Sequence, residues 1–154
     1  MPQESVVVRK EEMQELLAQA PAPGKHGLEP FKSFAKARGL PFIILEDTDV
    51  INDAEAHMHE GDVWLCLEGE VTFRYGGELV HAWPKQNPDG TTDTRELKAK
   101  EIRNGTDVIL KPGDWLWIPS GVPHQHRTKG TARLVIIKIP SVHALTKGMK
   151  ARIL

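Results

Sequence analysis

The sequence predicts an all-β domain, a sandwich or barrel of short strands, with a short helical segment before it. Thirteen glycines and 11 prolines are spread along the 154 residues. From residue 40 onward they separate short apolar runs, which is typical of strands joined by turns. The helical patterns lie before that point. A chain of this length has room for one ordinary domain and can bury about two thirds of its unfolded surface.

The helical segment is predicted from its periodicity. Residues 11–20 are rich in good helix formers, and Pro21 ends the pattern. Residues 31–38 could add one or two further turns, which Gly39 would close. We therefore expect residues 1–39 to form an N-terminal helical extension. One apolar stripe of the first helix contains Met13, Leu16, Leu17 and Ala20.

The predicted barrel spans residues 40–140, and residues 141–154 are expected to form a tail. Apolar runs at 63–67 and 134–137 leave no polar face. Such strands are covered on both sides, here by the N-terminal helix, a second sheet or another subunit. Residues 84–94 are expected to form a polar loop. The expected strands are 41–45, two within 63–75 that break at 68–70, 78–83, 95–103, 108–110, 114–118, 124–128 and 132–139.

Composition excludes several classes of partner. Twenty Lys plus Arg against 21 Asp plus Glu leave a net charge of −1, so there is no electrostatic reason to expect nucleic acid or an acidic membrane surface. The single cysteine excludes a disulfide framework and a multi-cysteine zinc site. Apolar runs are far shorter than the roughly 20 residues of a membrane helix. The first residues do not resemble a signal peptide, so a cytoplasmic location is expected.

Two closely spaced histidine pairs point to a metal site. His57 and His59 form one pair, and His124 and His126 form the other. Residues two apart on a strand share a face, so each pair would present two imidazoles in one direction. Histidine is the commonest metal ligand in proteins, although one such pair on a surface is usually incidental. Three histidines suit Fe, Mn, Ni, Cu or Zn, and the residue types alone do not choose among them.

The context of both pairs resembles the two sequence motifs of the cupin superfamily. His57-x-His59 is followed by Asp62, six residues and Gly69. The resemblance covers about residues 40–139. It implies a double-stranded β-helix (jelly-roll) barrel with metal ligands at His57, His59 and His124. The second motif is matched by Gly113, Pro119, Gly121 and His124, all in register.

The acidic ligand departs from the family pattern. The family's glutamate usually follows the second histidine after three or four intervening residues, which are the positions of Val63 and Trp64 here. Asp62 keeps the spacing to the glycine but comes one residue early. We favour Asp62 as a fourth ligand over a site of three histidines alone. Glu60, which is adjacent to His59, would point to the opposite face.

Further residues are candidates for the surroundings of the metal. His126 shares a face with His124 and is predicted to support a ligand or carry a proton near the metal, the alternative being a histidine at the barrel mouth. Trp64 and Cys66 share the face of Asp62. Together with Trp117 they are predicted to line an apolar substrate pocket. The alternative is that the aromatic residues fill the core and that Cys66 is a buried apolar residue.

The resemblance implies a mononuclear metal-dependent enzyme that acts on a small organic molecule, and we expect a homodimer. An Fe(II) dioxygenase is favoured, since open positions at the iron could take substrate and O₂ together. With Zn, Mn or Ni, the metal would act as a Lewis acid in an isomerase, lyase or decarboxylase. A cupin that binds a sugar or another small ligand without turnover is the alternative from a different class.

Overall fold

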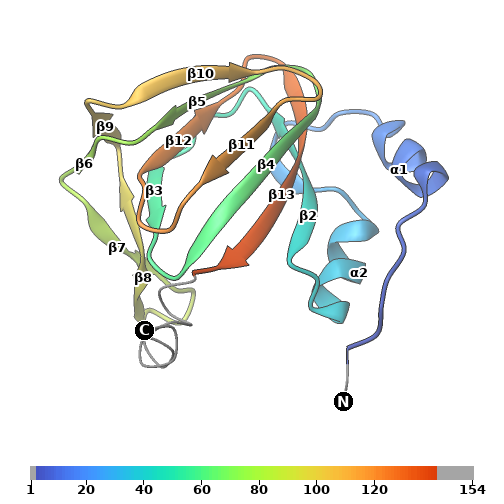
Figure 1. Cartoon of the computed structure of the whole chain (residues 1–154), viewed down its shortest axis with the longest axis horizontal. Coiled ribbons are helices and arrows are strands. Elements are labelled where there is room, and N and C mark those ends of the chain that lie inside the picture. Colours follow the sequence, from blue (N-terminus) through green and yellow to red (C-terminus); the bar gives the residue numbers. More distant parts are fainter. Residues whose placement is uncertain (1–2, 142–154) are drawn as a thin grey trace, which may run out of the picture.

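The computed structural model describes residues 3–141 and contains two facing antiparallel sheets (Figure 1). One sheet has the strand order β1-β2-β13-β4-β11, and the other has the order β10-β5-β12-β3-β8-β7. Strands β6 and β9 form a separate pair. The elements are α1 (Lys10–Leu17), β1 (Gly24–Gly27), α2 (Phe31–Arg38), β2 (Phe42–Thr48), β3 (Ala54–His57), β4 (Glu60–Glu68), β5 (Val71–Tyr75), β6 (Glu78–Val80), β7 (Trp83–Gln86), β8 (Thr92–Ala99), β9 (Glu101–Arg103), β10 (Thr106–Leu110), β11 (Trp115–Ile118), β12 (His124–Arg127) and β13 (Thr131–Pro140). The all-β jelly-roll prediction is confirmed.

The main core lies between the two sheets. Alternate residues of each strand face inward, as the period of two requires. On β4 the inward residues include Trp64 and Cys66, and on β5 they include Phe73. Trp64 and Phe73 pack with their ring centroids 5.1 Å apart. The remaining members of this core are Leu45, Val71, Leu110, Ile118, Ala132 and Leu134.

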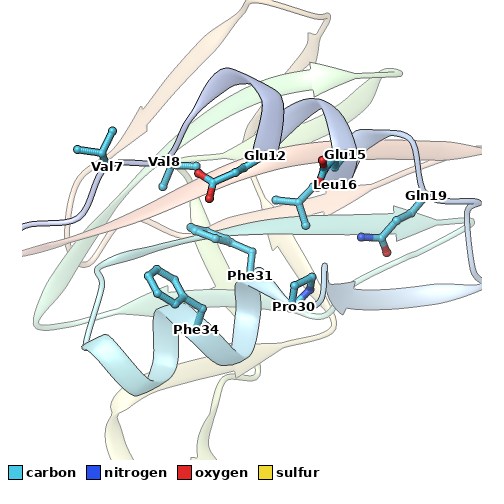
Figure 2. Close-up of a pocket in the computed structure, with 9 residues that line it drawn as sticks. All are labelled: Val7, Val8, Glu12, Glu15, Leu16, Gln19, Pro30, Phe31 and Phe34. Atoms are coloured by element: carbon cyan, nitrogen blue, oxygen red, sulfur yellow. The ribbon is translucent and has the colours of Figure 1, made fainter.

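The two helices cover the outer face of the five-stranded sheet. Leu16 of α1 and Phe31 of α2 point toward one another between the helices (Figure 2). Beneath them, Ile44 of β2 and Val135 of β13 belong to the same apolar cluster. The N-terminal segment therefore covers the predicted apolar outer face at Leu67 and Val135. Farther along β4, Val63 lines an open apolar groove with Trp117 and Ile139. An apolar groove of about 460 Å³ remains between α1 and α2.

A buried ion pair anchors this helical cover to the sheet. Arg133 of β13 donates to Glu46 of β2 at 2.8 Å, and its guanidinium also donates to the carbonyl oxygens of Leu17 and Gln19, where α1 has ended. The other oxygen of Glu46 accepts from the Ala22 amide at 3.0 Å. Burial opposes the charge of Glu46, yet the bonds from Ala22 and Arg133 hold the pKa of this carboxyl below its ordinary value.

Some elements differ from those predicted. Residues 24–27 form β1, which pairs with β2, so the segment before residue 40 contributes a strand as well as helices. The predicted polar loop at 84–94 contains most of β7 and the start of β8. Of the predicted tail at 141–154, only Ser141 lies within the described residues. Among residues 3–141, no helix has the length and apolar character needed to cross a membrane.

Candidate metal centre

Five charged or imidazole side chains from strands of both sheets point inward and lie close together. Glu55 and His57 alternate on β3, and His124 of β12 lies opposite Glu55. In the other sheet, Asp62 of β4 lies opposite Lys138 of β13. Since alternate residues of a strand share a face, these positions all face the interior between the sheets. We call Glu55, His57, Asp62 and His124 the carboxylate–histidine cluster.

The donor atoms of this cluster have the spacing of metal ligands. His57 Nε2 lies 3.5 Å from Glu55 Oε1 and 3.6 Å from Asp62 Oδ2. His124 Nε2 lies 3.5 Å and 3.3 Å from the same two oxygens. Glu55, His57 and His124 can each place one ligand atom within 4.8 Å of the others. Neighbouring ligand atoms of one metal are about 3.0 to 3.4 Å apart, for octahedral to tetrahedral angles, when the bonds are about 2.1 Å long.

Two buried atoms of the cluster lack a hydrogen bond within the described part of the chain and lie 3.3 Å apart as an ion pair, and a cation bound to both would satisfy them equally. His124 Nε2 and Asp62 Oδ2 have no hydrogen-bond partner among residues 3–141, whereas buried polar atoms are normally paired. His124 Nδ1 donates to the carbonyl of Val122 at 3.0 Å, which directs Nε2 into the cluster. Ligating histidines usually donate their second ring nitrogen in this way. Two imidazoles and two carboxylates are suitable donors for a divalent transition metal.

The charges of the cluster stabilise one another. Burial opposes the charge of the Glu55 and Asp62 carboxyls, but contacts with His124 and His57 hold the pKa of both groups below the ordinary value. Burial likewise disfavours the His124 imidazolium, yet Asp62 and Glu55 raise the pKa of His124 to about 9. His124 is therefore protonated at neutral pH, and a metal must displace this proton to bind at Nε2.

Two lysines contact the carboxylates of the cluster. Lys138 Nζ donates to Asp62 Oδ1 at 2.7 Å and lies 3.3 Å from His57 Nε2. Lys98 Nζ donates to Glu55 Oε2 at 3.0 Å. Burial lowers the pKa of Lys98, but the neighbouring Glu55 more than offsets this effect, so the net shift is upward. The Lys98 ammonium therefore stays charged at neutral pH. Both lysines compete with any metal for the same carboxylates.

A cavity of about 560 Å³ adjoins the cluster and lies between the two sheets. Glu55 and His57 lie in its wall, and Trp64 lines it from β4. Volumes of this size are typical of small-molecule sites. The apolar side of the cavity is formed by Leu40, Pro41, Phe42, Ile43, Leu45, Trp64 and Ile136.

The structure does not bring His59 into the cluster. The argument that His57 and His59 share a strand face is corrected, because β3 ends at His57 and His59 lies in the bend that leads to β4. The side chain of His59 is exposed. Glu60 begins β4 and lies at the rim, where its carboxylate is 3.6 Å from Lys138 Nζ. The assignment of His59 as a ligand stays a prediction without support from this geometry.

Glu55 is the cluster member that the sequence analysis missed, and its signal was present. Four residues separate His57 from Asp62, so His57 takes the place of the second motif histidine and Glu55 takes the place of the first. In this register Asp62 has the usual spacing on both sides. Lys138 was also missed, although it continues the inward alternation of Leu134 and Ile136 on β13.

His126 occupies the core and not the cavity wall. Its Nε2 lies 2.7 Å from Asp47 Oδ2, and Asn52 Nδ2 lies 2.6 Å from the same nitrogen. The ring packs between Trp64 and Phe73, with centroids 5.2 Å and 5.1 Å away. His126 thus shares a face with His124, as expected, but its environment is closed. The catalytic role suggested for it stays a prediction.

The three predicted pocket residues have separate locations. Trp64 lines the cavity, whereas Cys66 lies deeper in the core, where burial raises the pKa of its thiol. Trp117 does not line the cavity. Its neighbour Ile118 faces inward on β11, so Trp117 points outward by alternation and is 52% exposed.

Comparisons with known proteins identify the domain type. The JmjC domain family (JmjC_2) matches residues 48–145. No curated protein matches the chain. Similar solved structures include the CENP-C cupin domain of Drosophila melanogaster, with 11% identity, a TM-score of 0.45 and coverage of 67% of this chain and 58% of that one. The chain spans less than two thirds of that structure.

Two further similar structures come from bacterial proteins. A putative ethanolamine utilization protein Q of Salmonella typhimurium LT2 has 16% identity and a TM-score of 0.42, with coverage of 69% of this chain and 63% of that one. Hydroxypropylphosphonic acid epoxidase of S. wedmorenis, in complex with fosfomycin, has 17% identity and a TM-score of 0.43, with coverage of 68% and 46%. At such low sequence identity, the similarity to these structures is one of fold alone.

Proposed function

The chain belongs to the JmjC domain family of the cupin superfamily, and we propose that it is an Fe(II)-dependent dioxygenase of a small organic molecule. The observation that carries this proposal is the carboxylate–histidine cluster beside a cavity of about 560 Å³. Two histidines and one carboxylate with open positions form the ligand set of many non-haem Fe(II) oxygenases. Here His57, His124 and Glu55 supply that set, and Asp62 contacts both imidazoles.

Different residues would hold the metal, orient a ligand and exclude water. His57, His124 and Glu55 would hold the metal, which when bound supplies Lewis acidity and redox chemistry. The Val122 carbonyl fixes the orientation of the His124 ring. Trp64 and the apolar wall exclude water from one side of the cavity and orient the organic part of a substrate. Because the ligands come from paired strands, their positions are fixed before a substrate arrives.

A second candidate has support from the second carboxylate. Asp62 and Glu55 both contact the imidazoles, and oxygen-rich sites suit Mn²⁺ better than a site of histidines alone. In that case the protein would be a metal-dependent isomerase, lyase or decarboxylase, in which the metal polarises a carbonyl group. The same residues hold the metal in both versions.

Metal binding and oxygen consumption test the proposal separately. Anaerobic calorimetry should show about one Fe(II) bound per chain, and the loaded protein should consume O₂ with a member of a panel of catechols, β-diketones and thiols. The matched controls are Glu55→Ala with His57→Ala, which should bind no iron, and His59→Ala, which should bind normally. Iron binding without oxygen uptake, together with turnover of a keto acid or sugar with Mn²⁺, would favour the second candidate.

A further inference from the structure

The outer face of the five-stranded sheet carries an apolar patch that the helices do not cover. Val63 of β4, Trp117 of β11 and Ile139 of β13 line a groove of about 520 Å³, and among residues 3–141 no charged side chain lines it. Trp115 lies on the same face of β11 as Trp117, because residues two apart on a strand share a face. We call Val63, Trp115, Trp117 and Ile139 the β11 patch. Contiguous apolar surface on a folded domain is typical of an interaction site.

Exposed tryptophans dominate the β11 patch. Trp115 and Trp117 are 63% and 52% exposed, and Ile139 is 38% exposed. Together these three side chains expose roughly 350 Å² per chain, taking about 250 Å² for a fully exposed tryptophan. Two facing copies would thus bury about 700 Å² from these side chains alone, which is close to half of a standard interface of about 1,600 Å². The rest of the groove and the backbone edge of β11 add to this area.

Trp117 is held in position before any partner arrives. Its indole ring lies over Gly61 of β4, where the Cβ of any other residue would collide with the ring. One face of the ring therefore rests on the sheet while the remainder stays open to solvent. A ring that is already seated loses little conformational freedom on binding, and such tryptophans often contribute most of the energy of a protein interface.

The strand β11 also offers an unpaired backbone edge. The outer strands are β1 and β11 in one large sheet and β10 and β7 in the other, and in the described part of the chain β11 pairs with β4 alone (Figure 1). Each of the other three outer strands contains a charged residue, namely Lys25 in β1, Lys85 in β7 and Asp107 in β10. Charged residues on an edge oppose pairing with another chain, whereas Trp115–Ile118 contains none.

A second copy of the chain is the occupant that matches both features. A free strand edge can pair antiparallel with the same strand of another copy around a two-fold axis, so this surface is complementary to itself. With Leu116 on that axis, each Trp115 would lie opposite the other copy's Trp117 on the same face of the joined sheet. Opposed aromatic side chains stabilise paired strands. Two uncharged patches also meet without burying an unpaired charge.

We propose that two copies of this chain associate through β11, so that their five-stranded sheets join into one continuous sheet with the four tryptophans packed across the junction. This association covers both the free edge of β11 and the part of the outer sheet face that the helices leave open. It does not depend on the metal centre, because Asp62 faces inward on β4 while the neighbouring Val63 faces the β11 patch.

Sedimentation equilibrium and tryptophan fluorescence of the full chain test this inference. We expect the wild-type protein to be a dimer at micromolar concentration. On dilution it should dissociate, and its emission should move to longer wavelength as Trp115 and Trp117 become exposed to water. Trp117→Glu should raise the dissociation constant of the dimer at least about 30-fold, which is the usual minimum for loss of a tryptophan that dominates an interface.

The matched control is Ile109→Glu, which adds the same charge at a side chain of the same exposure. Ile109 is 53% exposed on β10, an outer strand of the other sheet, so this variant should dimerise as the wild type does. Trp115→Glu is a second variant on β11 that leaves the contact of Trp117 with Gly61 intact, and it should weaken the dimer as well. Far-ultraviolet circular dichroism shows whether each variant keeps the fold.

Amide hydrogen exchange tests the pairing of the strands themselves. The backbone amides of residues 115–118 that β4 does not engage should exchange at least tenfold more slowly in the dimer than in the monomer. This protection should disappear in Trp117→Glu and persist in Ile109→Glu. Amides of β10 should show no such dependence on association.

Each contrary outcome overturns the inference. A wild-type protein that stays monomeric at high concentration has no such interface. A dimer that Trp117→Glu and Trp115→Glu leave unchanged uses another surface, and a dimer without protection of residues 115–118 is not joined through strand edges. A monomer whose tryptophan emission moves to longer wavelength when residues 142–154 are deleted would assign the β11 patch to that segment of the same chain.

Discussion

His124 and His126 lie two residues apart on the same face of β12, and both are 1% exposed. They nevertheless have different surroundings. His124 directs Nε2 toward the carboxylates of Glu55 and Asp62 beside a cavity. His126 is enclosed by Trp64 and Phe73, with Nε2 beside Asp47. A His-x-His pattern therefore does not define a site, because the surroundings of each ring nitrogen decide whether a metal can reach it.

The largest expected effect concerns metal binding. Replacing both Glu55 and His57 by Ala should lower Fe(II) or Mn²⁺ affinity by at least about 100-fold. Loss of a residue that only hydrogen-bonds to a ligand typically lowers metal affinity about 10- to 100-fold, and loss of the ligands themselves should cost more. Calorimetry and elemental analysis check this result. His126→Asn is the matched control and should keep the metal. Equal metal loss in both variants would remove the distinction between the carboxylate–histidine cluster and the enclosed His126.

The second effect concerns stability, and here the larger change is expected at His126, which does not belong to the metal site. His126→Ala should lower the free energy of unfolding by about 3 kcal/mol, because it removes a packed ring and leaves Asp47 and Asn52 without their partner. Urea denaturation of metal-free protein measures this change. The folded fraction should still bind metal. A stability loss below about 0.5 kcal/mol would contradict the closed environment described for His126.

The third effect depends on pH. The pKa of His124 is raised from 6.5 to about 9 in the folded protein, so the folded state holds this proton more tightly than the unfolded state does. Its contribution to stability is complete below about pH 6.5 and is lost as pH rises through about 9, which amounts to about 3 kcal/mol. Denaturation of metal-free protein should show this loss, and His124→Asn should abolish it. A wild-type stability that is flat from pH 6.5 to 9 would contradict it.

The smallest effect is expected at His59. Its side chain is exposed in the bend after β3, so His59→Ala should change metal affinity less than twofold and stability by at most about 0.5 kcal/mol. Calorimetry and thermal melting check both values. A large loss of metal would show that the bend closes over the cluster and that the sequence-based assignment of His59 is right.

The fold was predictable because strand alternation and turns are local properties. The apolar runs at 63–67 and 134–137 correctly indicated strands, and the helices cover their outer face at Leu67 and Val135. The strand β1 was not predictable, since Gly24–Gly27 contains little apolar character and is held by pairing with β2. The metal, its reaction, the homodimer and the location stay predictions.

The candidate site was only partly predictable. His57, Asp62 and His124 were predicted from motif spacing, but the end of β3 decides which neighbour of His57 shares its face. Strand pairing depends on contacts between residues that are distant in the sequence. The exclusion of His59 and the inclusion of Glu55 therefore required the structure. Lys138 lies 76 residues from Asp62 in the sequence, and a single sequence does not reveal such a pairing.

The anchoring of the helical cover has a consequence for any shortened form of the protein. The predicted boundary at residue 40 would remove the backbone groups that Arg133 and Glu46 contact on the outer sheet face. It would also expose Ile44 and Val135 to solvent. A barrel expressed from residue 40 would expose an apolar surface around Arg133 and Glu46, which would have lost part of their hydrogen bonds. We therefore expect this shortened protein to aggregate when it is expressed. The first 39 residues thus keep the barrel soluble by covering part of the apolar outer face of its sheet.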